Sequence, residues 1–170
     1  MSRAIVIYES MFGNTKAVAE SVAAGLREHL PVDVVEVSAA PARVAGDVLL
    51  LVVGGPTHAF SMSRVDSRRA AGDEAAQGLV STGTGLREWL ERLQYAEGVR
   101  TAAFDTRMKK AFLPGSAARA AQKRLVRRGF RSLAEAESFW VEGMQGPLRD
   151  GEIDRARAWG EALGAATRAG

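Results

Sequence analysis

Residues 4–26 read AIVIYESMFGNTKAVAESVAAGL, and this stretch says most about the fold. Residues 4–8 form a short apolar run with branched side chains, which predicts a β-strand. Residues 14–28 carry valine and leucine at a spacing of four, which predicts a helix with one apolar face. Residues 9–16 join the two directly. A strand that runs straight into a helix in this way is typical of α/β domains.

The rest of the chain continues this alternation. Further strands are predicted at residues 32–37, 48–53, 99–104 and 130–141, the last interrupted near Glu135. Further helices are predicted from three apolar stripes: Leu86, Trp89, Leu90 and Leu93; Ala118, Ala121 and Leu125; and Ile153, Ala156, Gly160 and Leu163. Residues 54–56, Gly-Gly-Pro, are expected to end the third strand.

Residues 57–81 are polar and lack a clear period, which predicts a long loop that is either functional or mobile. The alternation as a whole predicts an α/β fold. Five parallel strands form the middle of a three-layer sandwich, with right-handed crossovers, in a single domain over residues 1–170.

The composition is that of an ordinary globular protein of 170 residues, with 46% hydrophobic and 25% charged residues. No stretch approaches the length of a membrane span, and no leader peptide is expected at the N-terminus. The chain has no cysteine, which excludes disulfides, iron–sulfur clusters and thiolate zinc sites, and no metal site is predicted. A cytoplasmic protein is therefore expected.

The net charge is +3, and much of the excess lies in residues 107–131, which contain no Asp or Glu. The predicted helix 116–128 has a basic outer face carrying Arg119, Lys123 and Arg127. This face is either simply solvated or a peripheral contact for an acidic protein or an anionic membrane surface. Nucleic acid is not an expected partner, because no aromatic platform accompanies the charge.

The loop at residues 9–16 offers groups suited to a phosphate. The hydroxyls of Ser10 and Thr15 converge there on the start of a helix, which carries unpaired N–H donors and a partial positive charge. Gly13 allows close approach of the backbone. The alternative is that Asn14 merely caps the helix. Taken alone, the loop leaves both interpretations open.

Other phosphate motifs do not match. The chain has no Walker A sequence, and Gly-x-Gly-x-x-Gly does not follow the first strand. The segment Gly83-Thr84-Gly85 precedes a helix but follows a loop, so it is a weak candidate. A phosphoryl-accepting receiver domain would need an Asp at the end of the third strand, where this chain has Val53-Gly54-Gly55.

Three loops together resemble the flavodoxin family. Tyr8-Glu9-Ser10-Met11-Phe12-Gly13-Asn14-Thr15 is similar to its FMN phosphate loop, although Phe12 stands where a hydroxyl residue is usual. Gly54-Gly55-Pro56-Thr57-His58-Ala59-Phe60 and Phe104-Asp105-Thr106-Arg107 resemble the loops on either side of the flavin ring. The resemblance covers nearly the whole chain and implies the strand order 2-1-3-4-5.

The resemblance also implies a set of FMN-binding residues: Ser10, Met11, Phe12, Gly13, Asn14, Thr15, Pro56, Thr57, His58, Ala59, Phe60, Asp105, Thr106 and Arg107. The Trp and Tyr that commonly sandwich the ring are missing from these loops, which leaves His58, Phe60, Met108 and Phe112 as flat or soft groups. His58 is a candidate for ring contact or proton delivery. Arg107 is expected to favour an anionic reduced flavin. No catalytic residue is assigned.

Three functions follow from the resemblance. The protein is an FMN-binding electron carrier for a redox partner protein, or a small flavin oxidoreductase acting on a quinone or similar acceptor. Residues 57–81 favour the enzyme, because an insertion beside the flavin forms a lid or a pocket. Alternatively the domain holds no flavin and is a non-catalytic interaction module, as Phe12 and the missing ring aromatics suggest. The oligomeric state is left open.

Overall fold

The computed structural model describes residues 1–58, 61–74, 80–81, 83–109 and 114–170. The strands are β1 (Arg3–Tyr8), β2 (Val32–Glu36), β3 (Val48–His58), β4 (Ser61–Met62), β5 (Arg100–Met108), β6 (Arg131–Ser132) and β7 (Glu137–Val141). The helices are α1 (Asn14–Leu26), α2 (Val65–Glu74), α3 (Leu86–Arg92), α4 (Ala117–Arg127) and α5 (Glu152–Ala169), with a short 3-10 turn η1 (Val37–Ala39).

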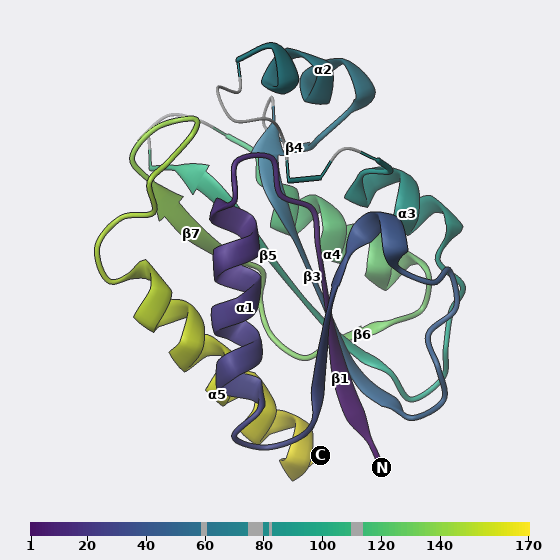
Figure 1. Ribbon diagram of the computed structural model, residues 1–170. Helices are drawn as coiled ribbons and strands as arrows, with labels where there is room; N and C mark the ends of the chain where they lie inside the picture. The colour runs from purple at the N-terminus through teal and green to yellow at the C-terminus, as the bar shows by residue number, and fades with distance from the viewer. Residues whose placement is uncertain (59–60, 75–79, 82, 110–113) are drawn as a thin grey trace.

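The sheet has the order β2-β1-β3-β5-β6, and β7 extends the pairing of β5 beyond β6. These strands are parallel, so the predicted order 2-1-3-4-5 is confirmed, with the fifth strand interrupted between β6 and β7 near Glu135 as expected. Figure 1 shows α1 and α5 on one face of the sheet and α3 and α4 on the other, while α2 lies beyond the carboxyl ends of the strands.

Each face of the sheet has its own apolar core. Along β1, Ile5 and Ile7 point into the core under α3 and α4, while Ala4 and Val6 point into the core under α1 and α5. The side chains of β3 alternate in the same way between the two cores. Because successive side chains of a strand point to opposite faces, a strand covered on both sides has to be apolar throughout.

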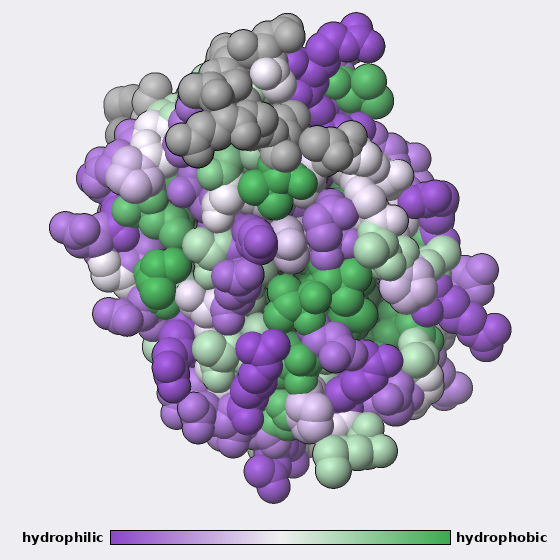
Figure 2. Space-filling view, in the orientation of Figure 1, coloured by the Kyte–Doolittle hydropathy of each residue, from purple (hydrophilic) through white to green (hydrophobic). Residues whose placement is uncertain are grey.

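Helices α1 and α5 pack closely because small residues face each other. A Cβ atom on Gly160 would lie 2.0 Å from the carbonyl oxygen of Val22, and one on Gly25 would lie 2.0 Å from that of Arg157. Figure 2 shows the same side of the molecule, where polar side chains cover most of the surface and an apolar area lies near the place where β1 and β2 overlap in the view of Figure 1. None of the helices in the described ranges is long and apolar enough to cross a bilayer.

Three sequence predictions are corrected. Residues 57–81 are not a single loop, because they contain the end of β3, the short strand β4 and the helix α2. Strand β3 does not end at Gly54-Gly55-Pro56; these residues pair with Phe104, Asp105 and Thr106 of β5. Ile153 is 42% exposed rather than part of the inner stripe of α5, which is formed by Ala156, Gly160 and Leu163.

Candidate functional site

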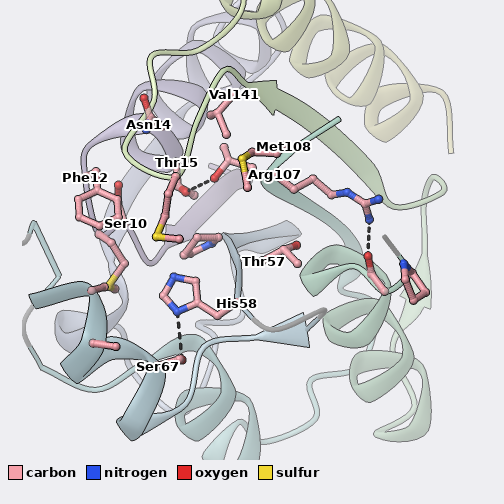
Figure 3. A pocket seen from close by; sticks show the side chains of 18 residues that line it. Ser10, Phe12, Asn14, Thr15, Thr57, His58, Ser67, Arg107, Met108 and Val141 are labelled. Atoms are coloured by element: carbon pink, nitrogen blue, oxygen red, sulfur yellow. Dashed lines mark hydrogen bonds between the residues drawn. The ribbon is translucent and has the colours of Figure 1, made fainter. Parts of the chain in front are cut away.

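A cavity of about 340 Å³ opens at the carboxyl edge of the sheet, where β1, β3, β5 and β7 end. Its walls come from residues 10–15, 56–58, 67–71, 106–108, 114–115 and 141–144, and Figure 3 shows their side chains. It is lined by Ser10, Met11, Phe12, Asn14, Thr15, Pro56, Thr57, His58, Ser67, Ala70, Ala71, Thr106, Arg107, Met108, Pro114, Gly115, Val141 and Met144. The carboxyl edge of an open parallel sheet is the usual ligand site of such folds.

The loop after β1 leads into α1 through Gly13, the N-cap residue, whose φ of 93° lies in the left-handed region that favours glycine. The N–H group of Gly13 donates to Ser10 Oγ at 3.1 Å. No side chain caps α1, so the interpretation of Asn14 as a capping residue is wrong; Asn14 is the first residue of the helix. Among the described residues, the N–H groups of residues 14–16 have no acceptor, so they remain available to a ligand.

Residues 80 and 81 form hydrogen bonds with the backbone of this loop. Ser81 donates its backbone N–H to the carbonyl oxygen of Ser10 at 2.7 Å, and its hydroxyl accepts from Ser10 N at 2.9 Å. The N–H group of Val80 donates to the carbonyl oxygen of Met11 at 3.0 Å. Ser10 and Met11 are both buried, and both contribute to the lining of the cavity. These hydrogen bonds tie the loop to residues 80 and 81.

A buried carboxylate follows β1 immediately. Glu9 is 1% exposed and accepts hydrogen bonds from the hydroxyl of Ser63 and from the N–H group of Leu86, which opens α3. Arg68 of α2 donates to the Ser63 hydroxyl at 2.9 Å and pairs with Glu88. Burial raises the pKa of Glu9, and the bonds from Ser63 and Leu86 together with the charge of Arg68 oppose that rise. Of the three arginines at 64–69, Arg68 is thus structural.

The end of β5 is tied to the start of α4. Asp105 is completely buried, and its Oδ2 accepts from the hydroxyls of Thr57 and Ser116 and from the N–H group of Ala118. Ser116 also caps α4 by accepting from Arg119 N. The other carboxylate oxygen of Asp105, Oδ1, has no hydrogen-bond partner among the described residues. The carboxylate stabilises the helix N-terminus, where a negative charge is favourable.

His58 ends β3 and reaches into the cavity. Its Nδ1 lies 3.1 Å from the hydroxyl oxygen of Ser67 on α2. Burial lowers the pKa of His58, and the positive charge of Arg68 lowers it further. The imidazole is therefore neutral at physiological pH.

Arg107 borders the cavity, but its guanidinium group is directed elsewhere. It donates to the carbonyl oxygen of Gly115, and its central carbon lies 5.6 Å from the ring centroid of Trp140. Figure 3 shows this charged end pointing away from His58. The role of Arg107 in favouring a reduced flavin stays a prediction.

Comparison with known proteins tests the family directly. The model of the family described as flavodoxin matches residues 6–161. The chain belongs to the flavodoxin family. A comparison with curated protein sequences found no match.

Solved structures agree with this flavodoxin assignment at the level of the fold. Oxidised flavodoxin 1 from Bacillus cereus is 18% identical, with a TM-score of 0.67 over 95% of this chain and 97% of that one. A flavodoxin from Streptococcus pneumoniae is 20% identical, with a TM-score of 0.66 over 96% and 99%. A WrbA-like flavodoxin from Agrobacterium tumefaciens is 17% identical, with a TM-score of 0.62 over 99% of each chain.

In this flavodoxin, most of the residues predicted to bind FMN line the one cavity described above. Gly13 and Asp105 do not line it: Gly13 shapes the loop, and Asp105 lies buried beneath the surface. Ala59, Phe60 and Phe112 lie outside the described residues. Trp89, Trp140 and Trp159 are not cavity residues; Trp89 is fully buried, and Trp159 packs edge-on against Phe104 and Phe139.

Sequence reasoning missed three parts of the wall, one of which is Pro114 and Gly115 before α4. Ser67, Ala70 and Ala71 come from α2, which lies in the segment predicted to be a loop. Val141 ends β7 and Met144 follows it, and the carboxyl end of this strand was not among the loops predicted to form the site. The rule that ligands bind at the carboxyl ends of parallel strands applied to that strand as well and could have found these two.

Proposed function

We propose that this flavodoxin-family protein binds FMN in the cavity and carries electrons to or from a redox partner protein or a small acceptor. One observation supports this most strongly: a single cavity joins unbonded N–H donors at the start of α1 to a mostly apolar chamber between the ends of β3 and β5. FMN has the same two parts, an anionic phosphate and a flat ring. When bound, it supplies one- and two-electron chemistry.

The phosphate end fits an anion through the backbone and Ser10. The N–H groups of residues 14–16 point out of the first turn of α1 without acceptors among the described residues. Ser10 Oγ accepts from Gly13 N, which leaves the hydroxyl hydrogen of Ser10 free to donate to a phosphate oxygen. Phe12 adds an apolar wall where a further hydroxyl is usual in the family.

The ring end is mostly apolar. It is lined by Pro56 and His58 from the end of β3 and by Thr106 and Met108 from the end of β5. The soft thioether of Met108 and the imidazole of His58 can contact a flat ring in place of the aromatic pair common in flavodoxins. Among the described lining residues, Arg107 carries the charge and its guanidinium bonds to the carbonyl oxygen of Gly115, so apolar contact and backbone groups are expected to hold the ring.

The test is a titration of the purified protein with FMN and with riboflavin, followed by flavin fluorescence and absorption. FMN is expected to bind at least about tenfold more tightly than riboflavin, because only FMN has the phosphate that the helix N-terminus would hold. Equal affinities would remove the phosphate site from the proposal. A protein that binds neither flavin would support the alternative of a non-catalytic interaction module.

A second candidate, a flavin oxidoreductase, is favoured by α2. Ser67, Ala70 and Ala71 of this helix add a wall that encloses the ring end of the cavity, which suits a protein that admits a small substrate. The FMN-loaded protein should then oxidise NAD(P)H with a quinone as acceptor. A carrier would stay inactive in this assay until a reductase was added.

A further inference from the structure

The hydroxyl group of Ser67 has three polar neighbours and one hydrogen. Its oxygen lies 2.8 Å from the backbone nitrogen of Arg64, 3.1 Å from the carbonyl oxygen of Arg64 and 3.1 Å from Nδ1 of His58. A serine hydroxyl donates once and accepts twice. The Arg64 amide can only donate to it, and the Arg64 carbonyl can only accept from it. The two Arg64 contacts therefore use the hydrogen and one lone pair.

The remaining lone pair of Ser67 decides the tautomer of His58. If Nδ1 carries the ring hydrogen, it donates to this lone pair and all three contacts are hydrogen bonds at once. If Nδ1 is bare, the Ser67 hydrogen has to turn to it, and two oxygen lone pairs face each other at the Arg64 carbonyl. A neutral imidazole has one N–H group and one acceptor nitrogen. The tautomer with hydrogen on Nδ1 is favoured, because only that tautomer lets Ser67 make all three hydrogen bonds.

The consequence lies at the other nitrogen. Figure 3 shows the His58 ring with Nδ1 towards Ser67 and its second nitrogen, Nε2, towards the interior of the cavity. With hydrogen on Nδ1, Nε2 presents a bare lone pair there. Burial and the charge of Arg68 keep the ring neutral by lowering the pKa of His58, so this lone pair is not lost to a proton at physiological pH.

We propose that His58 Nε2 is the hydrogen-bond acceptor for a ring N–H group of the molecule in the cavity, with Ser67 as the positioning residue that fixes the tautomer. The ligand part of this inference rests on the proposed FMN function. Oxidised flavin has one ring N–H group, in its pyrimidine ring, and two-electron reduction adds another at N5, with one more at N1 when the reduced ring is neutral. A group that accepts from the first would hold either redox state, whereas one that accepts from the second would favour the reduced state.

The tautomer is measured first, on the free protein, by ¹⁵N NMR of the histidine rings. The chain has 2 histidines, so His58→Gln assigns the signals. A protonated Nδ1 and a bare Nε2 are expected in the wild type. Ser67→Ala should shift a large part of the population to the opposite tautomer, and Ser67→Thr, which keeps the hydroxyl, should restore the wild-type pattern. A wild-type protein with hydrogen on Nε2 would overturn the role of Ser67 without reference to any ligand.

The ligand is tested next, with FMN as the probe. The Nε2 signal should move when oxidised FMN is added if the pyrimidine N–H is the donor, or only after reduction if the added N–H is the donor. His58→Phe should weaken FMN binding about threefold to tenfold in the corresponding redox state, the size expected for one neutral hydrogen bond. An Nε2 signal that moves in neither state overturns the acceptor role. Failure of the wild type to bind FMN overturns both the acceptor role of His58 and the proposed function. The tautomer measured on the free protein still tests whether Ser67 positions the His58 ring.

Discussion

The hydroxyl of Thr15 lies 2.7 Å from the hydroxyl of Thr106, and both residues are buried. Thr15 belongs to the first turn of α1, and Thr106 belongs to the last part of β5. This bond therefore joins the loop expected to hold the phosphate to the strand end expected to hold the ring. It has a consequence for stability that can be separated from binding.

Thr106→Val is expected to lower the free energy of unfolding by about 1–3 kcal/mol, because valine has a similar shape but leaves the Thr15 hydroxyl buried without its partner. The double variant Thr15→Val with Thr106→Val should recover most of that loss, since no polar group is then left unpaired. Urea denaturation of the four proteins measures the cycle. Simply additive losses would show that the bond contributes little.

Glu9→Gln should change how stability depends on pH. Burial raises the pKa of Glu9 in the folded protein, so the folded state keeps a proton at pH values where the unfolded chain has released it. The Glu9 carboxyl therefore makes the wild type less stable as pH rises from the unfolded pKa through the folded pKa. The stability of Glu9→Gln relative to wild type should rise over that window and level off above it.

Denaturation curves recorded from about pH 4 upward follow this window. The matched control is Glu97→Gln, which changes an exposed glutamate and should follow the wild-type profile. If Glu9→Gln also ran parallel to the wild type, Glu9 would have the same pKa in the folded and unfolded states.

Gly160→Ala should destabilise the protein although alanine is the better helix former. The added Cβ would lie 2.0 Å from the backbone oxygen of Val22, and neither helix can yield there without moving away from the other. A loss of about 1–3 kcal/mol is expected from overpacking, after the gain of about 1 kcal/mol from helix propensity. Gly164→Ala is the control, because its nearest neighbour is the side chain of His29, and it should cost less in the same thermal or urea denaturation.

Phe12→Ser tests the position of the phosphate under the proposed function. A hydroxyl at this half-buried position adds a donor beside the start of α1 and removes an apolar wall. FMN affinity is expected to rise up to about tenfold, because hydrogen bonds to charged groups contribute about 1.5–3 kcal/mol before the lost apolar contact is subtracted. Riboflavin affinity should not rise. Equal gains for both flavins would place the effect away from the phosphate.

Several features of the fold were predictable because their causes are local. The apolar runs of β1 and β3 reflect burial on both faces, and the stripes of α1, α3 and α4 reflect burial on one. Both patterns can be read within a few residues. The interruption near Glu135 was visible for the same reason, and the structure has it between β6 and β7.

Helix α2 was missed for a physical reason. It has little apolar face to produce a period: Val65 is 58% exposed, and Ala71 is its one buried hydrophobic residue among those described. Arg68 holds it instead, through Ser63 and Glu88. Such polar contacts connect parts of the chain that are distant in sequence, so no local sequence pattern predicts them.

The sequence alone was enough to infer the order of strands and helices and the edge of the sheet where a ligand would lie. These features follow from the spacing of hydrophobic residues, which is visible within a single strand or helix. Folding alone decided which groups meet at that edge. Thr15 bonds to Thr106, which is 91 positions away in the sequence, and Ser10 bonds to Ser81, which is 71 positions away. His58 contacts Ser67 only because residues 65–74 form helix α2. These contacts depend on how the segments pack in three dimensions, and that information is not contained in any one segment.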